Sequence, residues 1–189
     1  MGIVTKTGDK GTTGTLGGNR LLKSSALIEL NGQIDEVNAS LGYVNSLIEE
    51  GKDFSKKLEI MELIQYIQNG LYNLGTEISS GFTITRFQER HTLYLEEKID
   101  EMTALMPTQT KFIIFSGTKS ATYTHVARTI SRRCEREFVR YLLEENIDPF
   151  PACYKFLNRL SDFLFTLARF LNQEQGGIEV ETIPWNSEG

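Results

Sequence analysis

The sequence contains few prolines and few cysteines. Only four prolines occur in 189 residues, and because proline breaks helices, their scarcity leaves room for long uninterrupted ones. The two cysteines, Cys134 and Cys153, lack Cys-x-x-C spacing. We therefore expect reduced, structural thiols in a cytoplasmic protein.

Long apolar runs and an excess of positive charge are also absent. No stretch approaches the roughly 18 apolar residues of a membrane span, and the first six residues lack the apolar core of a secretory signal. The net charge of −5 disfavours nonspecific nucleic-acid binding by the whole surface. We expect neither a membrane nor a nucleic acid as partner. The length, with 40% hydrophobic and 24% charged residues, indicates one globular domain.

Glycine is concentrated in the first two dozen residues. Five glycines lie between Gly8 and Gly18, among threonines, Lys6, Lys10 and Arg20. Glycine permits positive φ angles and close approach of the backbone to a ligand, and successive N–H groups in such turns bind anions. The segment suits a polyphosphate cradle, although it carries neither the Walker A pattern nor G-x-G-x-x-G. The alternative is a mobile, glycine-rich tail.

Apolar residues at helical spacing predict five helices. In the first, they recur at intervals of three and four residues, at Ile34, Val37, Leu41, Val44 and Ile48. The helices are expected at about residues 24–50, 54–78, 87–105, 119–145 and 152–173. Short connections between helices of this length indicate an all-α, antiparallel five-helix bundle. Lys111–Phe115 is short, apolar and β-prone, and the tail from residue 174 is expected to be loosely ordered.

The helix expected at 119–145 carries a charged stripe beside its apolar face. Spacings of four and three residues stack Arg128, Arg132 and Glu135 above one another. Arginine suits bidentate binding of phosphate or carboxylate; the alternative is a solvated basic face. His125 is more typical of a packed, hydrogen-bonded histidine than of a catalyst. The expected core residues of this helix are Val126, Ala127, Ile130, Cys134, Phe138 and Tyr141.

Three residues on other helices are also candidates. Asn158, on a polar stripe of the last helix, suits a ribose or phosphate, or is a plain surface amide. Phe163 lies at the edge of that helix's apolar arc and is expected to face a pocket or a partner. Asp35 falls outside the apolar stripe of the first helix, so it is either exposed or paired with an arginine. The apolar stripe of the last helix consists of Phe156, Leu160, Leu164, Leu167 and Leu171.

Several segments match one family. They are Thr5–Thr13 with Arg20 and Lys23, then Gly32-x-x-Asp35-Glu36-x-Asn38, His125–Arg136 and Phe156–Phe165. In this order, and over nearly the whole chain, they resemble the PduO-type ATP:cob(I)alamin adenosyltransferases, lactobacillal members above all. Two positions depart from the family pattern. Asn31 replaces a frequent aromatic residue, and Phe115–Thr118 replaces a Leu-Pro-Gly-Gly-like run.

The resemblance implies a homotrimer of five-helix bundles with active sites between subunits. Residues 1–23 would be an ATP-binding loop, 24–173 the bundle and 174–189 a tail, all in one domain. Arg128 would pair with Asp35 across the subunit boundary, and Phe112 and Phe163 would flank the corrinoid where its lower nucleotide ligand leaves. The residues implied for ATP are Thr5, Lys6, Thr7, Gly8, Thr13, Gly14 and Lys23 at the triphosphate, completed by Arg132, Arg133, Glu135, Arg136 and Asn158.

The implied reaction moves the 5′-deoxyadenosyl group of ATP to the cobalt of cob(I)alamin and releases triphosphate. Cob(I)alamin is a strong nucleophile, so no general base is needed, which fits the lack of a Ser/His/Asp or Cys/His constellation. Catalysis would depend on Arg132, Phe112, Arg128 and Asp35. Mg²⁺ would be held mainly through the ATP phosphates, and no side chain is identified as its ligand. A cob(II)alamin reductase and an adenosylcobalamin-dependent enzyme are the other implied partners.

Two other functions stay open on the residues alone. One is a different ATP-dependent transfer reaction on the same bundle. The other is an ATP-binding regulatory or scaffold protein without turnover. The arginine stripe and the Phe112 segment favour an enzyme over a protein that only binds ATP.

Overall fold

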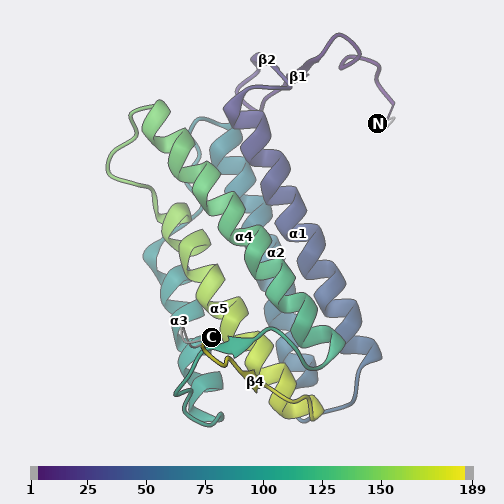
Figure 1. Ribbon diagram of the computed structural model, residues 1–189. Coiled ribbons are helices and arrows are strands. Elements are labelled where there is room, and N and C mark those ends of the chain that lie inside the picture. The colour runs from purple at the N-terminus through teal and green to yellow at the C-terminus, as the bar shows by residue number, and fades with distance from the viewer. Residues whose placement is uncertain (1–3, 186–189) are drawn as a thin grey trace.

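Five helices make up most of the structure, a computed structural model that describes residues 4–185. They run alternately up and down the bundle (Figure 1). They are α1 (Ala26–Glu50), α2 (Lys57–Ser79), α3 (Glu89–Ala104), α4 (Lys119–Glu144) and α5 (Ala152–Gln175). All five predicted helices are confirmed, with ends within three residues of those expected. Along residues 4–185, none of the helices has the length and apolar character needed to cross a membrane.

Two short strand pairs lie at opposite ends of the bundle (Figure 1). β1 (Thr12–Gly14) pairs antiparallel with β2 (Arg20–Leu22) close to the start of α1. β3 (Ile113–Ile114) pairs antiparallel with β4 (Val180–Glu181). The β-prone segment therefore does contain a short strand. Residues 174–185 of the tail are more ordered than expected, because the backbone of β4 pairs with that of β3.

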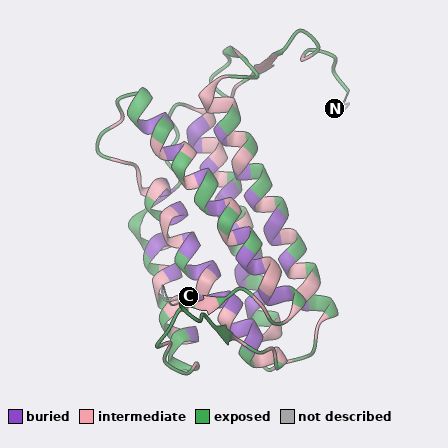
Figure 2. Cartoon of the chain, in the orientation of Figure 1, coloured by how far each residue is buried: buried purple, intermediate pink, exposed green. Residues whose placement is uncertain are grey.

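The core lies between the helices, with buried residues on their inward faces (Figure 2). α5 packs against α3 and α4, and α1 packs against α2 and α4. The apolar stripes predicted for α1 and α5 are buried throughout. Each large apolar side chain buried in this way contributes roughly 1.5–3 kcal/mol to folding, so these two stripes are a main source of stability.

Two residues lie where the helical pattern does not place them. Val126, expected in the core, is 42% exposed, because α4 turns Thr124, His125 and Ala127 inward instead. Phe163, expected to face a pocket or a partner, is 0% exposed and belongs to the core. The reason is that α5 packs against both α3 and α4, which buries more than one of its faces.

The two cysteines are free, buried thiols, in agreement with the sequence. Burial raises the pKa of Cys134 to about 12 and also raises the pKa of Cys153. Because the thiolate is the reactive form of cysteine, both side chains are inert at neutral pH.

Candidate functional site

The glycine-rich segment folds into a hairpin beside the start of α1 (Figure 1). Gly11 and Gly18 have φ angles of +76° and +80°, which residues with a Cβ rarely adopt. The Gly11 N–H donates to the Gly8 carbonyl, and the Gly18 N–H donates to the Thr15 carbonyl, both at 3.1 Å. From residue 4 onward, the segment is therefore a defined loop in this structure.

Arg20 holds this loop together. Its guanidinium donates to the Thr7 carbonyl at 2.5 Å, the Thr12 carbonyl at 3.2 Å and the Thr12 hydroxyl at 2.8 Å. The Lys23 side chain lies beside Gly8, since a Cβ added at Gly8 would be 3.1 Å from the Lys23 ammonium nitrogen. Two of the predicted triphosphate residues, Gly8 and Lys23, are thus neighbours. The sequence motif contains Arg20 but predicts no such role for it.

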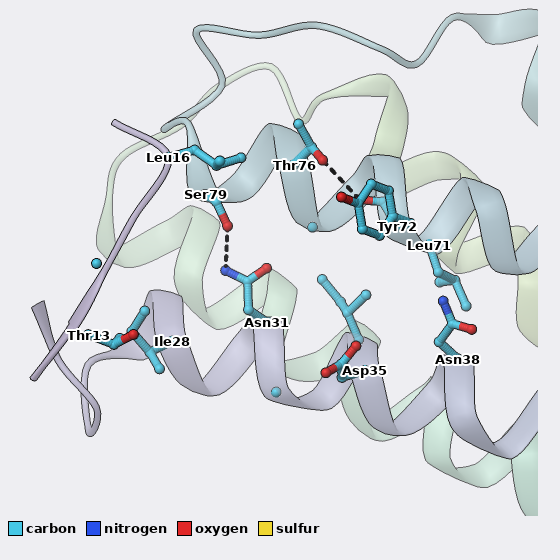
Figure 3. A pocket seen from close by; sticks show the side chains of 14 residues that line it. Thr13, Leu16, Ile28, Asn31, Asp35, Asn38, Leu71, Tyr72, Thr76 and Ser79 are labelled. Atoms are coloured by element: carbon cyan, nitrogen blue, oxygen red, sulfur yellow. Dashed lines mark hydrogen bonds between the residues drawn. The ribbon is translucent and has the colours of Figure 1, made fainter. Parts of the chain in front are cut away.

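A groove of about 460 Å³ lies between α1 and α2 and is bordered by the loop (Figure 3). Thr13 and Gly14, both predicted for the triphosphate, line it together with the exposed Asp35 of α1. The Asn31 amide bridges the two helices by donating to the Ser79 hydroxyl at 3.0 Å. The groove therefore places two loop residues and the Asp35 carboxylate around one space.

The arginines of α4 differ in their partners. Arg132 and Arg136 are exposed, and within residues 4–185 neither makes an ion pair or a side-chain hydrogen bond. Arg133 instead pairs with Glu36 of α1, and both side chains are about half exposed. Exposed pairs of this kind contribute only about 0–1 kcal/mol, so Arg133 can exchange Glu36 for a stronger anion at little cost.

Glu135 and Asn158 meet between α4 and α5. The Asn158 amide donates to Glu135 Oε1 at 2.6 Å, and both side chains are partly buried. Asn158 is therefore more than a plain surface amide. The fold thus brings together two residues that the family pattern implies for the nucleotide. Glu135 lies on α4 with Arg132 and Arg136, and Asn158 comes from α5.

His125 and Arg128 occupy a more apolar part of α4. His125 is 2% exposed, and its ring stacks on Phe115 with centroids 4.3 Å apart. Neither ring nitrogen has a hydrogen-bond partner within residues 4–185. Among those residues, the prediction that His125 is packed is confirmed, and the prediction that it is hydrogen-bonded is wrong. Burial, aided by the nearby Arg128 charge, lowers the pKa of His125 to about 4. The ring is therefore neutral at pH 7.

Phe112 and Phe163, the two phenylalanines implied for the corrinoid, lie in opposite environments. Phe112 is 82% exposed, next to β3, and its carbonyl accepts from the Thr182 N–H at 2.8 Å. Phe163 is enclosed in the core, so it presents no ring surface to a ligand in this structure. Of the two, only Phe112 is placed to touch a bound molecule.

Comparisons with known proteins show which family the chain resembles. A profile of the family described as Cobalamin adenosyltransferase matches residues 3–171. A cobalamin adenosyltransferase of Cupriavidus metallidurans is 35% identical over 179 residues, which cover 94% of this chain and 92% of the relative. The corrinoid adenosyltransferase of Bacillus subtilis is 36% identical over 186 residues, covering 96% and 92%. The human corrinoid adenosyltransferase MMAB is 36% identical, covering 94% and 71%.

Solved structures share the fold. The F112A variant of a PduO-type ATP:corrinoid adenosyltransferase from Lactobacillus reuteri, complexed with cobalamin and ATP, gives a TM-score of 0.85 at 34% identity, covering 96% of this chain and 99% of that one. The R132K variant, complexed with ATP, gives 0.85 at 35% identity, covering 96% and 100%. Since the profile spans most of the chain and the relatives match it nearly end to end, this chain belongs to the cobalamin adenosyltransferase family.

Proposed function

We propose that this chain moves the 5′-deoxyadenosyl group of ATP to the cobalt of cob(I)alamin and releases triphosphate. The observation that carries the proposal is the exposed face of α4, where Arg132 and Arg136 have no partner within residues 4–185 and lie beside the Glu135–Asn158 pair. Neighbouring guanidiniums that pair with no carboxylate are a ready site for a polyphosphate. Membership of the family supports the same activity.

The reaction needs orientation and charge stabilisation rather than proton transfer. Cob(I)alamin is the nucleophile, and C5′ of ATP must be held in line with its cobalt. Negative charge develops on the leaving triphosphate, where Arg132, Lys23 and the N–H groups of the loop are suited to stabilise it. Phe112 would supply an apolar surface that offers no ligand to cobalt and excludes water. Phe163 is buried in the core, so we assign it no direct contact with the corrinoid.

Mg²⁺ is the expected companion of ATP. As a hard cation it prefers oxygen ligands, and the Thr5 and Thr7 hydroxyls, 3.0 Å apart in the loop, are of that type. Across residues 4–185, no three His, Cys, Asp or Glu side chains gather in a way that suits a metal ion. We therefore assign most of the Mg²⁺ ligands to the ATP phosphates, whose charge the ion would neutralise.

We further propose that the active site is shared between neighbouring subunits of a homotrimer. The β1–β2 hairpin of the loop and strand β4 lie at opposite ends of one bundle (Figure 1), and Phe112 lies beside β4, because its carbonyl accepts from the Thr182 N–H. The 26 residues of α4 alone span about 39 Å. Reacting atoms must approach to roughly 3–3.5 Å, so the loop of one chain and Phe112 of the same chain are too far apart to serve one reaction. A site formed by the loop of one subunit and by Phe112 and the α4 face of the next subunit would remove this separation.

The Arg128→Ala substitution tests the shared site. Within residues 4–185, neither Arg128 nor Asp35 makes an ion pair, which supports their pairing between subunits. Removing one member of a close interfacial charge pair costs about 2–5 kcal/mol, so we expect a weaker trimer or at least a tenfold loss of kcat/KM. Analytical ultracentrifugation and steady-state kinetics measure the two effects. An intact trimer with full activity would count against the pair, whereas rescue by the Asp35→Arg/Arg128→Asp double swap would support it.

The Arg20→Ala substitution tests the loop. It removes the three hydrogen bonds from Arg20 to Thr7 and Thr12 that hold the loop in its conformation. The loop then has to become ordered when ATP binds, which weakens binding. At roughly 1.4 kcal/mol for each factor of ten, loss of one net charge-assisted bond predicts about a tenfold weaker Kd for ATP by calorimetry. Lys10→Ala removes a charge from the same loop and serves as the control. Equal Kd values for both variants would show that Arg20 does not organise the site.

The overall activity has a direct test. The protein is incubated with ATP, Mg²⁺ and chemically reduced cobalamin, and the corrinoid absorption spectrum is followed. Conversion to adenosylcobalamin is expected. If the spectrum does not change beyond a control without protein, the chain would be an ATP-binding regulatory or scaffold protein instead.

The remaining parts of the proposal concern the setting of the enzyme. We infer a single domain in which residues 1–23 bind ATP, 24–173 form the bundle and 174–189 form a tail. A cytoplasmic location agrees with the free thiols. A cob(II)alamin reductase would supply the substrate, and an adenosylcobalamin-dependent enzyme would use the product.

A further inference from the structure

The segment that follows β3 meets the bundle at Phe115. The Phe115 ring stacks on His125, with centroids 4.3 Å apart and ring planes at 26°. The Arg128 guanidinium carbon lies 4.9 Å from the centre of the same ring. Phe165 of α5 lies 5.8 Å from the His125 ring and 5.7 Å from the Arg128 guanidinium. We call these four residues the Phe115 cluster.

Stacking and cation–π contact hold this cluster together, because its polar atoms lack hydrogen bonds. Both ring nitrogens of His125 and Nε of Arg128 are buried, and within residues 4–185 none of them has a hydrogen-bond partner. A guanidinium is attracted to the face of an aromatic ring, and the attraction grows as water is excluded. The position of Arg128 therefore depends on the Phe115 ring.

The chain directly after Phe115 is fixed to α5 by Asn172. The Asn172 amide donates to the Ser116 carbonyl at 2.9 Å, and its oxygen accepts from the Thr118 N–H at 2.9 Å. Gly117, between them, has a φ of +111°, and a Cβ there would collide with Asn172 Oδ1. This end of the segment is held in one conformation.

Phe112 stands three residues before Phe115, at the other end of the same segment. Three extended residues span only about 10 Å, and the strand between them is tied to β4. The contacts that Phe115 makes with α4 therefore help to fix where Phe112 stands. The exposed ring of Phe112 and the guanidinium of Arg128 are linked through Phe115.

We propose that Phe115 is a positioning residue for the corrinoid step: in contact with both His125 and Arg128, it sets where Phe112 stands relative to Arg128. The inference rests on the proposed function, in which Phe112 meets the corrinoid and Arg128 meets the next subunit. Phe115 then couples the corrinoid pocket to the subunit boundary. The leucine of the usual family pattern would fill space here without offering Arg128 a ring.

The Phe115→Leu substitution tests this role. It keeps an apolar side chain and removes the ring, so we expect the KM for cob(I)alamin to rise roughly fivefold, while the KM for ATP stays within about twofold. Phe115→Tyr keeps the ring and should behave as wild type. Phe150→Leu removes a ring that pairs with Tyr154 at 5.0 Å in another part of the bundle, and it should change neither KM. Equal rises in both KM values for Phe115→Leu would overturn the proposal.

A double-mutant cycle with Arg128 separates positioning from a general loss of packing. If the two residues act as a unit, Phe115→Leu adds nothing further in an Arg128→Ala background. Effects that simply multiply would overturn the coupling. Where Phe115→Leu folds poorly, Phe115→Met gives the same comparison. If the wild-type protein does not adenosylate cob(I)alamin, the proposed function is refuted. If the wild type is active and Phe115→Leu leaves the KM for cob(I)alamin unchanged, only the role of Phe115 is refuted.

Discussion

Replacing Arg132 with alanine is expected to lower kcat/KM for ATP by about ten- to a hundredfold. A charge-assisted hydrogen bond contributes roughly 1.5–3 kcal/mol, and about 1.4 kcal/mol corresponds to a factor of ten. Because Arg132 is exposed and bonds no side chain within residues 4–185, its removal leaves the fold of the chain intact. Steady-state kinetics with chemically reduced cobalamin measures the loss, and an unchanged thermal unfolding temperature confirms that the fold is preserved.

Arg140 provides the matched control for Arg132. It lies on the same helix, is exposed, and, among the described residues 4–185, pairs only with Glu137 three residues earlier. Arg140→Ala should therefore change kcat/KM by less than about twofold, since Arg140 itself is exposed and its pair with Glu137 is a local contact three residues apart on one helix, of a kind that contributes only a few tenths of a kcal/mol. Arg132→Lys keeps the charge but loses the two-pronged guanidinium, so an intermediate loss is expected. Full activity in Arg132→Ala would show that this face of α4 does not hold the triphosphate.

The helical architecture could be predicted because its signal is local. Apolar residues recurring every three or four positions determine both the existence of a helix and the face that it buries. The stripes from Ile34 to Ile48 and from Phe156 to Leu171 are inside as expected. Glycine and proline between the stripes mark the ends of most helices to within a few residues.

The positions of Phe163 and Val126 could not be predicted in the same way. A helical wheel distinguishes one apolar face, but it does not reveal how many neighbours enclose the helix. α5 packs against two other helices, which makes the edge position of Phe163 part of the core. In α4, His125 occupies one of the inward-facing positions, and Val126 is exposed.

The site shows the same limit. Motifs selected Glu135, Asn158 and Arg133, but only packing determines that Asn158 bonds Glu135 while Arg133 pairs with Glu36. The role of Arg20 depends on carbonyl groups whose directions arise from the folded loop. The environment of His125 depends on Phe115 and Phe165, which come from separate segments. Residue type and spacing identify candidates, and partners follow from tertiary structure.

Replacing Phe112 with alanine is expected to slow adenosylation that starts from cob(II)alamin far more than it weakens ATP binding. The ring is 82% exposed, so its loss leaves the core unchanged. Five-coordinate Co(II) is hard to reduce. An apolar ring beneath the corrin would keep water and other ligands from the fifth position, so that reduction becomes easier. Burying a phenylalanine against a ligand is worth roughly 1.5–3 kcal/mol, which predicts about a ten- to hundredfold slower conversion. The KM for ATP should change by less than about twofold.

The oxidation state of the starting corrinoid makes this test selective. When the Phe112→Ala variant receives chemically pre-reduced cob(I)alamin, the reduction step is bypassed, so its kcat should return close to that of the wild type, and only the KM for the corrinoid should stay raised. Leu58→Ala, which removes another exposed apolar side chain at the start of α2, should alter neither reaction. Equal losses in cob(II)alamin conversion and in ATP affinity would contradict the assignment, because the ring would then act through the fold or the nucleotide site rather than at the corrinoid.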